Sequence, residues 1–172
     1  MNAEELFSAI TSETYTTTDI HRRVRLLREY FEKKFFASQP DLAIDAFLAV
    51  QEASQADKDV LSGLGEAFYS SFTKDSCYKL LEGILIESKK IPTVRLNVAF
   101  DVPPDEVPKI GQWFRQNLPV NVLLDIRIDA DAFGGCTFAW NGVFHDYSLR
   151  YLLEKQKSDI VKVLESYGKK TN

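Results

Sequence analysis

Histidine, cysteine and methionine, which often bind transition metals, are scarce in this chain. Its 172 residues include two histidines, two cysteines and one methionine. The cysteines, Cys77 and Cys136, lie far apart and outside any C-x-x-C or Cys/His spacing, so a zinc site is not expected. Both have apolar neighbours, which predicts buried, reduced thiols.

Nucleotide-binding loops and membrane spans are also missing from the sequence. Neither G-x-x-x-x-G-K-[ST] nor G-x-G-x-x-G, the glycine-rich patterns that cradle phosphates, occurs. No apolar run approaches about 18 residues, and the opening MNAEELFSAI lacks the features of a signal peptide. A net charge of -4 does not favour nucleic acid or anionic lipid. Any work at a membrane would therefore depend on a partner.

His145 and Asp146 are the one adjacent pair that could act as an acid and a base. They stand where a strand is expected to give way to a helix, and a helix cap explains Asp146 without catalysis. His21 opens a charged helix and is expected to be solvated. A small hydrolase using His145 and Asp146 is kept as a minor alternative.

Apolar residues at helical spacing predict about five helices over residues 1–88, with the short connections of an antiparallel bundle. The longest is expected to begin at a cap, Thr18 or Asp19, and to end near Ala37. Pro40 is expected in the first turn of the next helix. That helix is apolar around most of its circumference, which predicts a central position in the bundle.

The other helices of this bundle are shorter. The first is expected to end near Ser12. One helix is predicted from an apolar stripe of Leu61, Leu64, Phe68 and Phe72, with Gly63-Leu64-Gly65 as a bent or closely packed point. Thr73 is expected to cap the last, whose stripe is Cys77, Leu81 and Ile84.

Arginines near the start of the longest helix form the strongest basic feature. Arg22, Arg23, Arg25 and Arg28 alternate with apolar residues at helical spacing, so they are expected on the outer faces. Nearby glutamates at three- or four-residue spacing favour a solvated face. A docking surface for an acidic partner is the main alternative.

Near residue 92 the apolar period changes from helical to alternating. Residues 93–100 and 120–128 alternate as strands on either side of a proline-started helix, which implies a right-handed crossover and parallel pairing. Gly134-Gly135 precedes a third strand, and Asn141-Gly142 predicts a hairpin to a fourth.

Asp146 or Ser148 is expected to cap a final helix. Its broad apolar stripe consists of Leu149, Leu152, Leu153, Ile160, Val163, Leu164 and Tyr167. This helix could cover the sheet and still leave Leu153, Ile160 or Val161 for a partner. The predicted fold is α+β, with an antiparallel helical bundle over 1–88 and a small α/β domain with a mixed sheet and a C-terminal helix over 89–172.

The paired glycines and the final cap resemble the signature of the delta subunit of F-type ATP synthases, the family of the oligomycin-sensitivity-conferring protein. There an Asp and an apolar-Gly-Gly lead into a hairpin, and Asp-x-Ser-apolar-Arg opens the last helix. The matching residues, with ten residues between the two parts, are Asp129, Phe133, Gly134, Gly135, Asp146, Ser148, Leu149 and Arg150. Ala130 and Ala132 replace a commoner Pro and Leu.

The resemblance implies a non-catalytic connector in the peripheral stalk, or stator, of a proton-translocating ATP synthase. Its N-terminal bundle would hold the N-termini of the alpha subunits, and its C-terminal domain the C-termini of the stalk b subunits. It implies no cofactor, one copy per complex, and a peripheral place on the cytoplasmic face of the cell membrane. The expected docking residues are Arg22, Arg25, Arg28, Leu153, Ile160 and Val161. A stand-alone adaptor or regulatory domain of similar architecture is the alternative.

Overall fold

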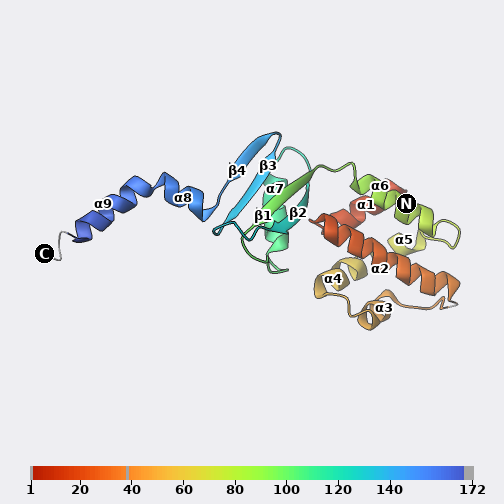
Figure 1. Cartoon of the computed structure of the whole chain (residues 1–172). Coiled ribbons are helices and arrows are strands. Elements are labelled where there is room, and N and C mark those ends of the chain that lie inside the picture. The colour runs from red at the N-terminus through yellow and green to blue at the C-terminus, as the bar shows by residue number, and fades with distance from the viewer. Residues whose placement is uncertain (1, 38, 169–172) are drawn as a thin grey trace. The chain divides into compact units, whose positions relative to one another are not determined.

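A computed structural model describes residues 2–37 and 39–168, with the side chains of the last helix described as far as Lys162. Over these residues the protein is α+β and carries a four-stranded mixed sheet, as the sequence predicted (Figure 1). Its contacts divide it into two compact units. The helical unit comprises Met1–Thr93 and Asp105–Leu123, and the sheet unit comprises Val94–Pro104 and Leu124–Asn172.

Six helices among the described residues precede the first strand. They are α1 (Ala3–Thr11), α2 (Thr17–Phe36), α3 (Ile44–Val50), α4 (Gln55–Gly63), α5 (Gly65–Ser70) and α6 (Cys77–Ser88). The sequence predicted about five, because α4 and α5 were expected as one helix. Gly65 takes a φ of +79°, which a right-handed helix cannot accommodate, and this interrupts the helix. A Cβ at Gly63 or Gly65 would meet nothing within 4 Å, so the point is a bend and not a close contact.

Three helix starts differ from the prediction. The cap of α2 is Thr16, whose side chain accepts a hydrogen bond from the Asp19 amide, so the helix starts earlier than expected. Helix α3 starts at Ile44, and Pro40 lies in the preceding turn. Helix α6 starts at Cys77, and Thr73 hydrogen-bonds to Ser76 before it.

Helices α1, α2 and α6 enclose the core of the helical unit. A Cβ at Gly83 of α6 would lie 2.7 Å from the Cβ of Ala3, so α1 and α6 approach closely there. Aromatic rings fill another part of this core, where Phe31 stacks on Phe72 at a centroid distance of 4.3 Å. The predicted central position of α3 is wrong, because α3 buries Phe47 and Leu48 but leaves Val50 75% exposed.

Helix α7 (Val107–Asn117) belongs to the helical unit, although it stands between β1 (Thr93–Val98) and β2 (Leu123–Ile128) along the chain. The chain therefore passes between the two units three times, after residues 93, 104 and 123. The sequence suggested one division between residues 88 and 89. The observed units differ from that division because α7 makes its contacts with the helical unit.

The sheet has the order β2-β1-β3-β4, with β3 at Cys136–Trp140 and β4 at Val143–Asp146. Strand β3 pairs antiparallel with β1 and with β4, so the parallel pairing of the mixed sheet falls to β1 and β2. Asn141 and Gly142 both take positive φ, 49° and 77°, in the turn between β3 and β4. This confirms the predicted two-residue hairpin.

Two helices end the described chain, α8 (Leu149–Lys155) and α9 (Lys157–Gly168). The sequence predicted one helix, but Gln156 leaves the helical conformation and separates them. No residue of α8 is buried, and every described side chain of α9 is exposed. The side chains of Val163, Leu164 and Tyr167 lie outside the described residues. None of the described helices is long and apolar enough to cross a membrane.

Candidate functional site

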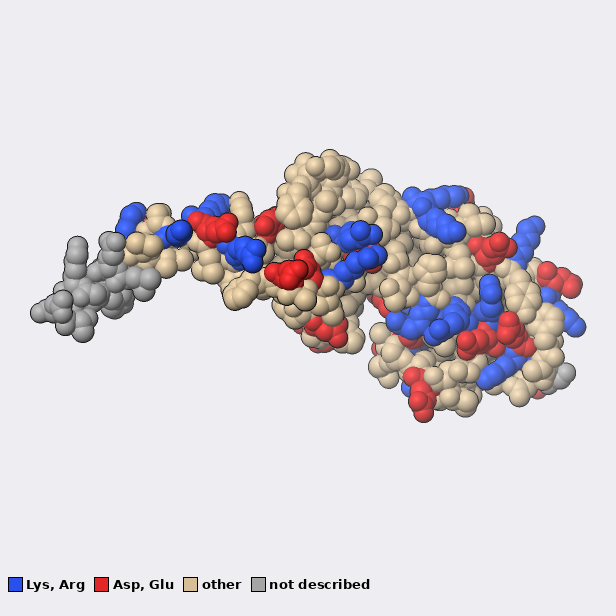
Figure 2. Space-filling view, in the orientation of Figure 1, with Lys and Arg blue, Asp and Glu red and all other residues tan. Residues whose placement is uncertain are grey.

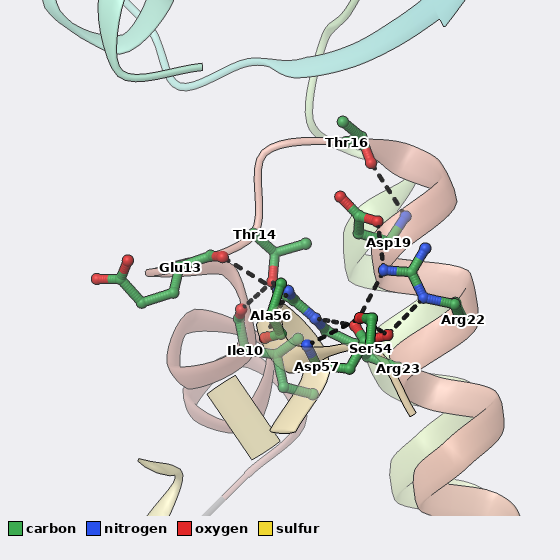
Figure 3. A network of polar contacts seen from close by, with 10 residues as sticks. All are labelled: Ile10, Glu13, Thr14, Thr16, Asp19, Arg22, Arg23, Ser54, Ala56 and Asp57. Atoms are coloured by element: carbon green, nitrogen blue, oxygen red, sulfur yellow. Dashed lines mark hydrogen bonds and ion pairs between the residues drawn. The ribbon is translucent and has the colours of Figure 1, made fainter. Parts of the chain in front are cut away.

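The arginines of α2 fall into two groups. Arg23 is buried, contrary to the expectation that all of them lie on outer faces, and Arg22 is half-buried. Both donate to the carboxylate of Asp57 at the start of α4, Arg22 through Nε at 2.7 Å and Arg23 through Nε at 2.9 Å (Figure 3). Arg22 also pairs with Asp19 at 2.7 Å. Arg22 is therefore engaged inside the helical unit.

Every oxygen of the buried Asp57 carboxylate is satisfied. Oδ1 accepts from both arginines, and Oδ2 accepts from Arg22 and from the Ser54 hydroxyl at 2.8 Å. Burial alone would raise the pKa of Asp57, but the hydrogen bonds from Arg22, Ser54 and Arg23 outweigh it and hold the pKa below its usual value. The carboxylate thus stays charged, and it joins α4 to α2.

Arg23 completes this network with bonds to the segment between α1 and α2. Its Nη1 donates to the Glu13 carbonyl at 3.1 Å and to the Thr14 hydroxyl, which in turn donates to the Ile10 carbonyl at 2.6 Å. Its Nη2 donates to the Ala56 carbonyl at 3.3 Å. These partners belong to three segments of the helical unit, so the network is architectural and presents no open site.

Arg25 and Arg28 remain on the surface, as predicted. The Arg25 side chain is 69% exposed and lies 3.9 Å from Glu29, and Arg28 lies over the Tyr78 ring at 6.0 Å. Charges of both signs are interspersed on the face drawn in Figure 2. A pair of exposed arginines is therefore available for steering, without a large field of one sign.

We call the matching residues between Asp129 and Gly135 and between Asp146 and Arg150 the glycine–cap motif, and its two parts come together in the sheet unit. Gly134 and Gly135 take φ of 73° and 75°, which favours glycine at both positions. The Gly134 carbonyl accepts from the Leu149 amide at 3.1 Å. A Cβ at Gly135 would lie 2.2 Å from the Tyr147 carbonyl oxygen, so the second glycine is needed for a close backbone approach.

Asp146 and Ser148 fix the start of α8. Ser148 is the cap, and its hydroxyl accepts from the Tyr151 amide at 3.2 Å. Asp146 Oδ1 accepts from the Ser148 amide at 2.8 Å, and the hydrogen bonds from Ser148 lower the pKa of Asp146. The predicted cap at Asp146 or Ser148 is confirmed, with Ser148 as the capping residue.

The remaining motif residues lie at the surface or in a turn. Asp129 Oδ1 accepts from the Asp131 amide at 3.0 Å, which closes the turn after β2. Phe133 is 66% exposed, and Leu149 and Arg150 are exposed in the first turn of α8. The motif therefore joins the β2–β3 turn, the end of β4 and the start of α8.

A set of exposed apolar side chains follows this junction on α8 and α9. Its described members are all exposed, namely Leu149, Tyr151, Leu152, Leu153, Ile160 and Val161. Val143 and Phe144 of β4 are exposed too, and the β3–β4 hairpin shows an uncharged surface in Figure 2. We call α8 and the described part of α9 the C-terminal apolar helices. The sequence predicted Leu149, Leu152, Leu153 and Ile160 in the stripe of the last helix and Val161 for docking. It did not predict that all of them would be exposed, because the helix was expected to cover the sheet, and α8 buries no residue.

The histidine, aspartate and cysteines that could react make structural contacts or lie at least partly buried. The His145 ring stacks on Phe138 at a centroid distance of 4.7 Å, and Asp146 serves the turn described above. Cys77 is buried and free, and burial raises its pKa; Cys136 is free and half-buried. Among the residues that the structure describes, no three His, Cys, Asp or Glu side chains group as metal ligands.

Comparison with known families gives no assignment. No protein-family model and no curated protein matches the chain.

Proposed function

We propose that this chain is a non-catalytic connector of the stator of an F-type ATP synthase, similar to the delta subunit. The observation that carries the proposal is the junction at Gly134, Gly135, Asp146 and Ser148. It has the spacing of the family motif, and it anchors helices whose apolar side chains stay exposed. A protein that holds another helix needs such a surface on a fixed support.

The exposed side chains of the C-terminal apolar helices favour a helical partner. Leu152 and Leu153 are 45% and 46% exposed, and burying an exposed side chain of this kind contributes about 1.5–3 kcal/mol at most. These side chains remain about half exposed in the folded chain, so a partner that buries them would add to this stabilisation. The amphipathic end of a stalk b subunit is the partner that the stator proposal assigns to this surface.

The helical unit supplies the second contact in this proposal. Arg25 and Arg28 are exposed on α2 and would steer an acidic or amphipathic N-terminal segment of an alpha subunit. Arg22 is a weaker candidate, because Asp57 and Asp19 already pair with it. Two moderate contacts in one chain reinforce each other through effective concentration, which suits a connector under torque.

The stand-alone adaptor shares these surfaces and differs only in its partners. The hydrolase alternative would need His145 and Asp146 to act together. Asp146 instead accepts from Ser148, and the His145 ring stacks on Phe138. The structural contacts therefore favour a connector over an enzyme.

The test uses the full chain, because a cut at residue 88 would remove α7 from the helical unit. Binding to the alpha-subunit N-terminal peptide and to the soluble b-subunit end from the same organism is measured by calorimetry. Arg25→Glu with Arg28→Glu should weaken the first and spare the second. Leu153→Glu with Ile160→Glu should do the reverse, and Lys89→Glu, an exposed charge reversal elsewhere, should spare both.

Failure of the intact chain to bind either partner would reject the stator proposal. So would loss of both partners in each double variant, since the two contacts would then share one surface. Binding of other helices with equal affinity would favour the adaptor.

A further inference from the structure

Arg115 of α7 holds the segment that joins α1 to α2. Its Nη1 donates to the Ser12 carbonyl at 2.9 Å, and its Nη2 donates to the carbonyls of Thr11 and Thr14 at 2.8 and 2.6 Å. Each bond joins residues that are more than 100 positions apart in the sequence: 103 for Ser12, 104 for Thr11 and 101 for Thr14. These carbonyls lie at and after the end of α1, where no further turn of the helix supplies amide donors. The guanidinium of Arg115 donates to them instead.

Tyr15 forms the other half of this contact. The Arg115 guanidinium lies over its ring, with Cζ 4.2 Å from the centroid, and Gln112 Nε2 donates to its hydroxyl at 3.3 Å. A Cβ on Gly111 would come within 2.3 Å of the ring, so α7 can approach Tyr15 only through glycine. Tyr15 itself is 6% exposed.

Arg23 of α2 also holds this segment. That guanidinium donates to the Glu13 carbonyl and the Thr14 hydroxyl, whereas Arg115 uses the Thr14 carbonyl. Two arginines, Arg23 of α2 and Arg115 of α7, therefore hold the non-helical segment of residues 12–16. Removing Arg115 leaves the Arg23 half in place.

Apolar burial holds α7 less firmly than it holds α6. Its buried residues are Gly111 and Phe114, whereas α6 buries Cys77, Leu81, Ile84 and Ser88. The Nε–H of Arg115 is also buried without a hydrogen-bond partner among the described residues, which subtracts from the contact. The attachment of α7 therefore depends strongly on the polar and aromatic contacts of Arg115, Gln112 and Tyr15.

We propose that Arg115 is a latch that keeps α7 in the helical unit, and that its release opens α7 locally while the α1–α2–α6 core stays folded. The latch is the set of contacts between Gly111, Gln112 and Arg115 on α7 and residues 11–15. Because α7 lies between β1 and β2, opening the latch frees the segment that makes two of the three passages between the units. This inference does not depend on the proposed function.

Hydrogen exchange of the full chain tests the latch by a local readout. Arg115→Lys keeps the charge but loses the three-carbonyl fork. Gly111→Ala keeps every polar group but pushes a methyl group into Tyr15. In both variants, amides of 107–117 and 12–16 should exchange faster while α6 keeps its protection. For Arg115→Lys the change should be about tenfold or more, as expected for one lost charge-assisted hydrogen bond.

Matched controls are Arg127→Lys, an exposed arginine of β2, and Gly63→Ala, a helical glycine with nothing within 4 Å of its Cβ. Neither should change exchange in α7. Unchanged α7 exchange in both latch variants would overturn the proposal. So would equal acceleration of α7 and α6, which would mean that α7 opens only when the whole unit unfolds. If Arg115→Lys does not fold, Gly111→Ala gives the same comparison.

Discussion

Helices α2 and α8 both carry large apolar side chains at helical spacing, yet their surroundings are opposite. Helix α2 buries Ile20, Val24, Leu26, Leu27, Tyr30 and Phe31, whereas α8 buries none of its residues. The first stripe is covered by α6 and α3 of its own unit. The second is covered by nothing in the described chain. An apolar stripe therefore shows that a helix has a face to bury, but the rest of the fold decides whether the chain itself provides the cover.

Helix α2 differs from α8 also in its charges. Arg23 and Asp57 are 3% and 1% exposed, and they place a complete ion pair inside the helical unit. The polar residues of α8, by contrast, are all in solvent. Disturbing the helical unit should therefore cost far more than disturbing α8, and the predictions below follow that order.

Asp57→Ala should have the largest effect, because it leaves the buried Arg23 guanidinium without its partner. The expected loss is about 3–5 kcal/mol in the free energy of unfolding, measured by urea denaturation. Asp59→Ala, in the same helix but exposed, should cost only a few tenths of a kcal/mol. Equal losses in the two variants would show that the buried network does not distinguish this helix.

Acid should remove the same contribution from the unmodified chain. Since the folded state lowers the pKa of Asp57, its stabilisation is present above the usual carboxyl pKa and is lost as pH falls through the lowered value. Asp57→Asn should therefore lose stability at neutral pH and show a flatter decline below about pH 4. Parallel stability curves for the two proteins would contradict this.

Leu27→Ala and Leu152→Ala test the two stripes directly. Leu27 is 0% exposed, so its truncation should cost about 2–5 kcal/mol by opening a cavity in the core. Leu152 is 45% exposed, so the same truncation should change stability by less than about 0.5 kcal/mol. A large loss at Leu152 in the isolated chain would mean that α8 is covered in solution.

Gly135→Ala should cost about 2 kcal/mol or more, because a positive φ and a 2.2 Å approach to the Tyr147 oxygen both oppose a Cβ. Gly142 has a similar φ of 77° but no atom within 4 Å of its Cβ. Gly142→Ala should therefore cost only the backbone term, about 1 kcal/mol. The difference between the two melting curves isolates the close approach in the motif.

Ser148→Ala should have a smaller effect than the substitutions at Asp57, Leu27 and Gly135, about 0.5–2 kcal/mol, through loss of the bond to the Tyr151 amide. Because α8 buries nothing, the loss should appear as faster amide exchange in 149–155 and leave the helical unit unchanged. Ser158→Ala, at an exposed position of α9, serves as the control. Global destabilisation by Ser148→Ala would show that α8 is coupled to the core.

Local signals in the sequence predicted much of the fold. The stripe of α2 and the alternation of β1 depend on period alone, and Asn141-Gly142 defines a turn by its own backbone preferences. The glycine–cap motif was found because its residues keep a fixed spacing. Each of these features is encoded within about twenty residues or fewer.

The buried ion pair was missed because its partners lie 34 residues apart. A signal was present, since Arg23 stands three residues after Ile20 and four before Leu27, within the buried stripe. Asp57 stands four residues before the buried Leu61. Similarly, the place of α7 was missed because its own period indicates a buried face but does not identify the elements that cover it.

The position of α7 also sets the order of events during synthesis on a ribosome. The helical unit lacks α7 until residue 117 is made, 29 residues after α6 ends at residue 88. At about 5–20 residues per second, synthesis of these residues takes about 1.5–6 s. During this time the carbonyls of Thr11, Ser12 and Thr14 lack the donor Arg115. Strand β1, which ends at Val98, is also made before Arg115, so both α6 and β1 are complete in sequence while the α1–α2 segment still lacks this donor.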